Sequence, residues 1–308
     1  MTSVFIDGKE GTTGLRIFER LSLRSDVKII TLDEEHRKDP EKRSEALNSC
    51  DIAFLCLPDA AAMEAAEMVK NPNVKIIDAS TAHRTAEAWV YGLPELSNEQ
   101  YEKIYASKRI ANPGCHASGF IALISPLVKA GLIGKEALLT ATSITGYSGG
   151  GKKMIAEYEA ENRNPLLSYP RPYALKLTHK HLKEMKALCG LDSAPAFLPV
   201  VADFYSGMCV TVPVFKKDIN GTKEDIEKLY ADHYKSDIVK YVPDAGEAGF
   251  ASAGILAGMD SMEISVHGND DTVLLMARYD NLGKGACGAT LECMNILMGK
   301  EPGYELKI

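Results

Sequence analysis

The feature that most constrains the fold of this chain is an alternation of short apolar runs with longer helical patterns over residues 1–111. The apolar runs are rich in β-branched residues and predict buried strands at residues 4–6, 27–31, 52–57, 74–77 and 109–111. The segments between them predict helices at residues 13–23, 40–48, 60–70 and 98–105. Such alternation predicts an α/β fold with a parallel, doubly wound sheet that helices cover on both faces.

After residue 115 the pattern changes to longer strands. Strands are predicted at residues 138–145, 197–201, 208–215, 261–267 and 272–278. Helices are predicted at residues 117–130, 152–162, 180–188, 223–233 and 286–298. This order predicts an α+β domain with a mixed or antiparallel sheet, and it places a domain boundary near residue 115.

Composition narrows the classes of partner. The chain has 35 Lys and Arg against 42 Asp and Glu, a formal charge of -7, which argues against a general nucleic-acid binder. Its most apolar stretch, residues 120–128, is interrupted by Ser125 and Pro126 and is too short to span a membrane. Seven cysteines with no CxxC pair predict free thiols in a reducing compartment, so we expect a cytoplasmic protein.

Three glycines follow the first predicted strand, at Gly8, Gly11 and Gly14, where the chain turns into the helix predicted at residues 13–23. Thr12 and Thr13 lie between the last two glycines. Glycine permits a tight turn and a close approach of the backbone to a pyrophosphate, which then lies at the helix N-terminus. This turn predicts nucleotide binding, with a purely structural turn as the alternative.

The residues after the second predicted strand leave the nicotinamide form open. Asp33 ends that strand, where an acid usually bonds the ribose hydroxyls of NAD. His36, Arg37 and Lys38 follow directly and suit the 2′-phosphate of NADP. The local evidence favours neither cofactor.

Cys115 lies at the predicted start of a helix, after Asn112, Pro113 and Gly114. The helix N-terminus favours a thiolate by only about 0.3–1 kcal/mol, which is less than one pKa unit. A catalytic Cys115 therefore also needs a histidine or another cation nearby. The alternative is a small buried apolar residue, which we expect for the other six cysteines.

Two histidines, His179 and His181, begin a later predicted helix, and either one suits a general acid/base. A metal site is the competing interpretation, but no third ligand with suitable spacing is evident. Three further loops are rich in groups that suit an anion, although each can also be an ordinary capped turn. They contain Ser80 and Arg84; Ser148, Gly149 and Lys152; and Asn281.

Together these segments resemble the short form of the N-acetyl-γ-glutamyl-phosphate reductase family. The resemblance covers nearly the whole chain and rests on an ordered set of motifs: the three-glycine turn, Asp78-x-Ser80-x-x-x-Arg84, Tyr91-Gly92-Leu93-Pro94-Glu95, Asn112-Pro113-Gly114-Cys115, Ser148-Gly149-Gly150-Gly151-Lys152, His179-x-His181-x-x-Glu184 and Asp280-Asn281-Leu282-x-Lys284-Gly285-Ala286. The chain departs from the family at His116-Ala117-Ser118, where an aromatic residue and a Pro-Thr pair are frequent, and at Lys9-Glu10.

The resemblance implies a Rossmann-type domain over residues 1–115 and 280–308, and a glyceraldehyde-3-phosphate-dehydrogenase-like catalytic domain over residues 116–279. It also implies NADP(H), an acyl phosphate substrate that releases phosphate, and a homodimer or homotetramer. Cys115 would form a thioester, and His181 or His179 would transfer the proton. The expected cofactor contacts are Gly8, Gly11, Thr12, Thr13, Gly14, Arg37, Ser80 and Asn281. The expected substrate contacts are Arg84, Asn112, Ser148, Gly149 and Lys152.

Other functions share parts of this pattern. Aspartate-semialdehyde dehydrogenase and an acyl-phosphate reductase of lysine biosynthesis use similar thiol chemistry. A non-catalytic nucleotide sensor is the alternative outside enzymes, but a sensor has no need of a nucleophile.

Overall fold

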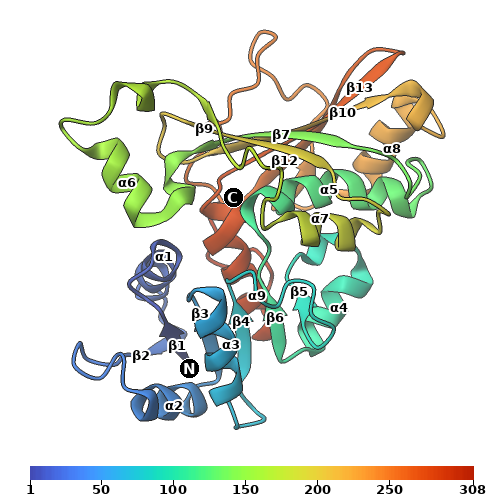
Figure 1. Cartoon of the computed structure of the whole chain (residues 1–308). Coiled ribbons are helices and arrows are strands. Elements are labelled where there is room, and N and C mark those ends of the chain that lie inside the picture. Colours follow the sequence, from blue (N-terminus) through green and yellow to red (C-terminus); the bar gives the residue numbers. More distant parts are fainter. The chain divides into compact units, whose positions relative to one another are not determined.

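The computed structural model describes residues 1–308 and divides into two compact units (Figure 1). The first unit contains Met1–Pro113 and Ala289–Tyr304, and the second contains Gly114–Gly288 and Glu305–Ile308. The sequence had placed residues 280–288 with the nucleotide-binding domain, whereas they belong to the second unit. There Ser206 Oγ donates to Asp280 Oδ2 at 2.8 Å and the Gly207 N–H donates to Asn281 Oδ1 at 2.9 Å.

The first unit contains a six-stranded sheet in the order β2-β1-β3-β4-β6-β5, in which every neighbouring pair is parallel. Its strands are β1 Thr2–Asp7, β2 Val27–Ile30, β3 Ile52–Leu55, β4 Lys75–Asp78, β5 Val90–Tyr91 and β6 Arg109–Ala111. Its helices are α1 Thr12–Leu21, α2 Pro40–Ser49, α3 Asp59–Met68, the 3₁₀ turn Pro94–Leu96 and α4 Asn98–Ala106. The doubly wound parallel sheet predicted from the sequence is confirmed, and only the two-residue β5 was missed.

The strand order of this sheet fixes where a ligand can bind. The connection from β1 leads outward to β2, and the chain then returns to β3 on the other side of β1. In open parallel sheets this reversal opens a crevice at the carboxyl ends of the two diverging strands. The glycine turn that follows β1 lies at that point.

Residues 289–304 complete the first unit although they are distant from it in sequence. Arg24 is buried and its Nη1 donates to Asn295 Oδ1 at 2.7 Å. Lys75 Nζ donates to the Leu297 carbonyl at 2.6 Å. Both contacts join the early part of the chain to α9 (Gly288–Leu297) or the residues beside it.

The second unit contains a seven-stranded sheet in the order β11-β12-β13-β10-β7-β9-β8. The β7–β9 and β11–β12 pairs are parallel and the others are antiparallel, so the sheet is mixed. Its strands are β7 Thr140–Gly146, β8 Arg171–Pro172, β9 Ala196–Ala202, β10 Met208–Phe215, β11 Val239–Tyr241, β12 Met262–Gly268 and β13 Thr272–Tyr279. Its helices are α5 Cys115–Lys129, α6 Gly151–Glu159, α7 Leu182–Cys189 and α8 Lys223–His233, with 3₁₀ turns at Tyr147–Gly150, Pro165–Ser168 and Lys216–Asp218 and a π turn at Gly283–Cys287.

Helix α5 is the centre of the second unit's core, and α7 and α8 pack beside it on the same face of the sheet (Figure 1). Pro126 lies inside α5 and has no N–H, so the Ala122 carbonyl loses its helical donor. Tyr234 replaces that donor, because its hydroxyl donates to the Ala122 carbonyl at 2.6 Å. The Tyr230 hydroxyl donates to the next carbonyl, that of Leu123. These bonds anchor a buried helix whose first residue is Cys115.

The opposite face of this sheet keeps exposed apolar side chains. A loop that includes Val242, Ala245 and Ala253 covers part of that face, over Cys209 and Met276. Ile144, Leu198 and Phe215 are 40%, 45% and 60% exposed. No helix in the structure has both the length and the apolar character needed to cross a membrane.

Candidate functional site

The glycine turn after β1 accepts only glycine at two positions. Gly8 has φ +85°, and a Cβ there would lie 2.4 Å from the Cys56 carbonyl oxygen. A Cβ on Gly14 would lie 2.5 Å from the Gly8 carbonyl oxygen. Side chains are therefore excluded at these two positions, and the partly exposed Gly11 is the N-cap of α1. This leaves the N-terminus of α1 open to an anion.

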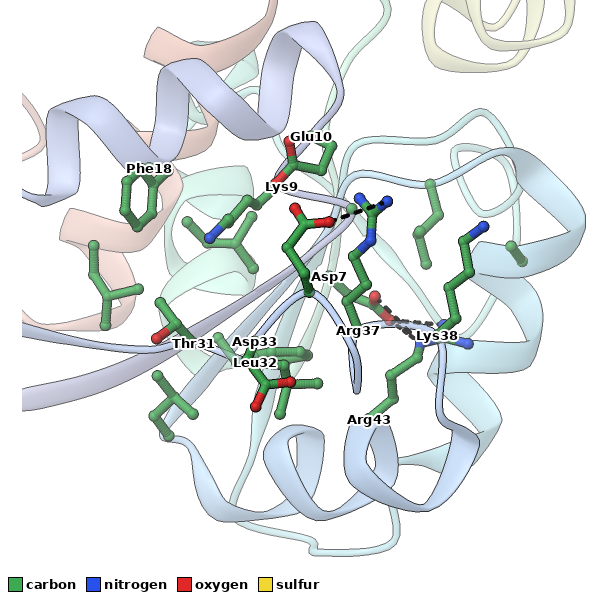
Figure 2. Close-up of a pocket in the computed structure, with 18 residues that line it drawn as sticks. Asp7, Lys9, Glu10, Phe18, Thr31, Leu32, Asp33, Arg37, Lys38 and Arg43 are labelled. Carbon is green, nitrogen blue, oxygen red and sulfur yellow. Dashed lines mark hydrogen bonds and ion pairs between the residues drawn. The ribbon is translucent and has the colours of Figure 1, made fainter.

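A cavity of about 500 Å³ lies beside this turn, at the carboxyl ends of β1 and β2 (Figure 2). Gly8 and Lys9 line it together with Arg37 and Lys38. Two of the lining residues form an ion pair, in which Arg43 Nη2 lies 2.8 Å from Asp7 Oδ2. The carboxylate of Asp7 raises the pKa of Arg43.

The rim of this cavity carries Asp33, Arg37 and Lys38, from which the sequence alone did not decide between NAD and NADP. Asp33 accepts a hydrogen bond from the His36 backbone N–H at 2.9 Å, and its Oδ1 lies 2.7 Å from His36 Nδ1. These contacts with His36 lower the pKa of Asp33. Arg37 Nη2 lies 3.6 Å from Glu34, a loose and exposed ion pair. The Asp33 carboxylate is thus engaged by its own loop, whereas the exposed Arg37 and Lys38 side chains remain suited to a phosphate.

The residues present fit a dinucleotide. The predicted contacts Gly8 and Arg37 line the cavity, and Gly11 and Gly14 shape the turn beside it. Thr12 begins α1, and its Oγ1 is buried without a hydrogen-bond partner. A phosphate oxygen would satisfy that hydroxyl. Thr13 follows it in the first helical turn and is partly exposed.

Two other predicted residues, Ser80 and Arg84, organise the loops after β4 and β6. Ser80 Oγ donates to Asp78 Oδ2 at 2.7 Å. Arg84 Nε donates to the Asn112 carbonyl at 2.9 Å, and its Nη2 lies 3.4 Å from the Ala79 carbonyl. The structure thus brings Arg84 to the predicted substrate contact Asn112, within the first unit. The ligand roles of these three residues stay predictions.

In the second unit, Cys115 is the first residue of α5. Gly114 caps the helix, and its N–H donates to the buried Glu184 Oε2 at 3.1 Å. The Tyr279 hydroxyl donates to the Cys115 carbonyl at 2.5 Å. A Cβ on Gly285 would lie 3.1 Å from Cys115 Cβ, so a larger residue there would crowd Cys115. Cys115 is partly exposed. The other six cysteines were predicted to be buried, which holds for five of them, but Cys56 is partly exposed.

The histidine pair lies around the first turn of α5. The rings of His179 and His181 are edge to face with centroids 4.6 Å apart, and the His181 N–H donates to His179 Nδ1 at 3.2 Å. The ring of His116, which follows Cys115 in the chain, lies 5.4 Å from His179 and 5.6 Å from His181. His181 is buried and His179 is partly exposed. The fold therefore brings the predicted pair to the start of the helix that carries Cys115.

Sequence reasoning missed a set of polar side chains beside this pair. His116 is 2% exposed; its Nδ1 lies 2.8 Å from Ser143 Oγ, and its Nε2 lies 2.6 Å from the Tyr173 hydroxyl. Burial, with smaller effects of His179 and Lys180, lowers the pKa of His116 to about 3. Burial and the negative charge of Cys115 raise the pKa of Tyr173. Only the position of His116 next to Cys115 offered a signal in the sequence.

The remaining predicted residues lie in two loops of the second unit. Asn281 Nδ2 donates to Ser148 Oγ at 3.0 Å, so a predicted cofactor contact and a predicted substrate contact are bonded to each other. Gly149 is exposed in the following turn, and Lys152 is exposed near the start of α6. No group of three or more His, Cys, Asp and Glu side chains is arranged to hold a metal ion.

Comparison with known proteins gives consistent matches for both units. The semialdehyde dehydrogenase NAD binding domain family matches residues 22–104, and the semialdehyde dehydrogenase dimerisation domain family matches residues 115–281. The chain is 41% identical to N-acetyl-gamma-glutamyl-phosphate reductase 2 of Nostoc sp., over 96% of each chain. It is 44% identical to the N-acetyl-gamma-glutamyl-phosphate reductase of Allorhizobium ampelinum, over 96% of this chain and 98% of that one.

Solved structures with the same fold include aspartate-semialdehyde dehydrogenases. The enzyme II of Vibrio cholerae, complexed with ASA, has a TM-score of 0.72 at 16% identity, over 97% of this chain and 98% of that one. The Candida albicans enzyme with NADP has a TM-score of 0.69 at 13% identity, over 97% and 98% of the two chains. At these identities the likeness confirms the two-domain fold and no more.

Proposed function

Since this chain belongs to the N-acetyl-γ-glutamyl-phosphate reductase family of semialdehyde dehydrogenases, we propose that it reduces N-acetyl-γ-glutamyl phosphate to N-acetylglutamate semialdehyde with NADPH, as a step of arginine biosynthesis. The observation that carries the chemistry is Cys115 at the N-terminus of α5, with His179 and His181 around the same helical turn. This arrangement suits a thiolate nucleophile with a nearby proton carrier.

The first half of the reaction transfers the acyl group to the protein. The Cys115 thiolate attacks the acyl carbon, a C–S bond forms, and the C–O bond to phosphate breaks to release inorganic phosphate. The partial positive charge at the start of α5 favours the thiolate and the oxyanion that develops beside it. A thioester on Cys115 remains.

The second half releases the aldehyde. When bound, NADPH supplies the hydride that reduces the thioester carbon. A histidine protonates the resulting oxyanion and then takes the proton back as the aldehyde C=O forms and the C–S bond breaks. Cys115 leaves as a thiolate, ready for the next turnover.

We assign this proton transfer to His179 rather than to His181. The Nδ1 of His179 accepts the His181 N–H, so a neutral His179 carries its proton on Nε2. His179 is also partly exposed, so it can exchange protons with solvent between turnovers, whereas His181 is buried. The backbone N–H of His181 then fixes the orientation of the His179 ring.

The other predicted contacts complete the proposal. Gly8, Gly11, Thr12, Thr13 and Gly14 would hold the pyrophosphate of NADPH, and Arg37 its 2′-phosphate. Ser80 and Asn281 are proposed as further cofactor contacts. Arg84, Asn112, Ser148, Gly149 and Lys152 are proposed to bind the phosphate or carboxylate of the substrate. A reducing compartment such as the cytoplasm suits a mechanism that depends on a free Cys115 thiolate.

We also propose that two copies of this chain associate through the second unit. Ile144, Leu198 and Phe215 leave apolar area on the sheet face opposite α5, and the matching domain family is named for dimerisation. Light scattering of the purified protein tests this proposal, and Leu198→Asp is expected to yield monomers. A wild-type protein that is itself monomeric would contradict the proposal.

The reaction is tested in reverse. The purified protein is mixed with N-acetylglutamate semialdehyde, phosphate and NADP⁺, and absorbance is followed at the NADPH band, with aspartate semialdehyde as the comparison. Phosphate-dependent NADPH formation with the acetylated aldehyde alone supports the proposal. Activity only with aspartate semialdehyde would move the chain to the sister activity and contradict the proposed substrate.

A further inference from the structure

Two buried polar side chains and one partly buried tyrosine connect the sheet of the second unit to the start of α5, and the proposed mechanism uses none of them. Ser143 lies on β7, His116 is the second residue of α5, and Tyr173 follows β8. They form a chain of hydrogen-bonded groups, with Ser143 Oγ 2.8 Å from His116 Nδ1 and His116 Nε2 2.6 Å from the Tyr173 hydroxyl. Both ring nitrogens of His116 are therefore occupied.

We propose that Ser143, His116 and Tyr173 form a relay that holds the Tyr173 hydroxyl beside Cys115, where it donates a hydrogen bond to the thiolate. In this relay His116 is a positioning residue that acts through Tyr173. The inference rests on the proposed role of Cys115 as the nucleophile, and it adds a residue that keeps this nucleophile charged.

The backbone fixes both ends of the relay. Tyr173 follows β8, whose residues pair with β9, and the Tyr173 N–H donates to the Pro199 carbonyl at 3.0 Å. His116 directly follows Cys115, so a phenol bonded to His116 Nε2 lies at the first turn of α5. The electrostatic effect of Cys115 on Tyr173 agrees with this placement, because the thiolate charge raises the pKa of the phenol.

The proton count of the relay explains why His116 must be neutral with one fixed tautomer. A neutral imidazole has one N–H and one lone pair. When the Ser143 hydroxyl donates to Nδ1, Nε2–H donates to the Tyr173 oxygen, and the phenol proton is left to point at the thiolate. The burial of His116 keeps it neutral, with a pKa of about 3.

Other charged and titratable groups surround the same helical turn and also influence Cys115. Glu184 on α7 bonds the Gly114 N–H, and Tyr279 on β13 bonds the Cys115 carbonyl. The remaining such groups are His179, Lys180 and His181 on the segment before α7 and the buried Lys284 on the turn after β13. Tyr173→Phe leaves these side chains in place, so their contribution cancels against wild type. His116→Phe also changes the ring that lies against His179 and His181, so Tyr173→Phe is the decisive variant.

The test measures the pH dependence of the alkylation of Cys115 by iodoacetamide in the full-length protein, followed by mass spectrometry of the Cys115 peptide. We expect Tyr173→Phe and His116→Phe each to raise the apparent pKa of Cys115 by about one unit, a tenfold loss of thiolate below that pKa. The double variant should match the single ones, because both changes remove the same bond. His116→Gln, whose amide can still meet the phenol, should stay within about threefold of wild type.

Tyr234→Phe is the matched control, because it removes another hydroxyl that bonds α5 without touching the relay. If His116→Phe does not fold, Ser143→Ala tests the end of the relay that is distant from Cys115. An increase in the apparent pKa of Cys115 is again expected. An unchanged alkylation profile in Tyr173→Phe, or additive shifts in the double variant, would overturn the relay. The measurement uses no acyl substrate, so a different substrate for the enzyme would leave its outcome interpretable.

Discussion

The turn between β1 and α1 is built to present its backbone, whereas the turn that begins α5 is built to present a side chain. In the first, Gly8 and Gly14 pack so closely that a Cβ would lie 2.4–2.5 Å from a carbonyl oxygen. In the second, Gly114 is capped by Glu184 and exposes the side chain of Cys115. Both lie at a helix N-terminus, which we propose attracts a phosphate in the first turn and favours a thiolate in the second.

This difference determines which substitutions should abolish the function of each turn. A backbone site depends on space and dihedral angles, so an added methyl group damages it. A side-chain site depends on particular atoms and on the residues that surround them. Five experiments break or sharpen this contrast.

Cys115→Ser should abolish turnover, at least about 1,000-fold, because a serine hydroxyl is a far weaker nucleophile than a thiolate. NADPH oxidation with the acyl phosphate measures turnover, and NADPH fluorescence should show unchanged cofactor binding. Cys56→Ser, at the other partly exposed cysteine, is the control. Appreciable turnover in Cys115→Ser would contradict the covalent mechanism.

His179→Asn should lower kcat by about 100- to 1,000-fold, because the amide keeps the acceptor for the His181 N–H but cannot carry a proton. His181→Asn should cost about tenfold less. Steady-state kinetics of both variants decide the assignment. A larger loss of kcat in His181→Asn than in His179→Asn would assign the proton transfer to His181.

Gly8→Ala should weaken NADPH binding about 100-fold and lower the free energy of unfolding by about 1–3 kcal/mol, through positive φ and contact with the Cys56 carbonyl. Gly131→Ala is the matched control, since Gly131 has φ +72° with no atom within 4 Å of an added Cβ. Fluorescence titration and denaturant unfolding measure both. Equal effects of the two changes on NADPH binding would contradict the claim that the backbone at Gly8 forms part of the cofactor site.

His116 should make the protein less stable as the pH falls. Its pKa is about 3 when folded and near 6.5 when unfolded, so between these values the unfolded state binds more protons. The free energy of unfolding should therefore fall by up to about 1.4 kcal/mol per pH unit below pH 6.5. His116→Phe should lack this part of the slope in guanidinium unfolding from pH 7 to pH 5. Parallel slopes would mean that His116 is not buried as a neutral group.

Arg37→Ala should weaken NADPH binding about tenfold and leave NADH binding unchanged, because only NADPH carries the 2′-phosphate. Lys42→Ala removes an exposed lysine that pairs with Glu45 on α2 and does not line the cavity. Titration with both nucleotides measures the ratio. An equal loss for NADH would assign Arg37 to another part of the cofactor.

The sequence predicted the regular parts of the fold because they depend on local patterns. The strands and helices of the first unit and the long strands of the second follow from hydrophobic periodicity, and the structure adds local caps such as Asp39 before Pro40. The strands that were missed, Val90–Tyr91, Arg171–Pro172 and Val239–Tyr241, are two or three residues long and lie at sheet edges. So short a run carries no period, and its pairing depends on the neighbouring strand.

The candidate site was predictable only where one motif contains it. Gly8, Cys115 and the pair His179 and His181 stand in recognisable local contexts. The Ser143–His116–Tyr173 relay instead joins three segments that meet only in the folded chain. For Arg84 the sequence context suggested a ligand contact, and the fold adds bonds from its guanidinium to the carbonyls of Ala79 and Asn112; its ligand role stays a prediction.

The discontinuous first unit has a consequence for how the chain is made. Arg24 and Lys75 form hydrogen bonds with Asn295 and Leu297, which are synthesised only after residues 114–288. At about 5–20 residues per second this delay lasts roughly ten seconds or more. During that time the second unit can complete its sheet while the parallel sheet lacks its last helix. The first unit therefore completes its contacts only after residues 289–304 are made, when α5, the helix that begins with Cys115, has already been synthesised.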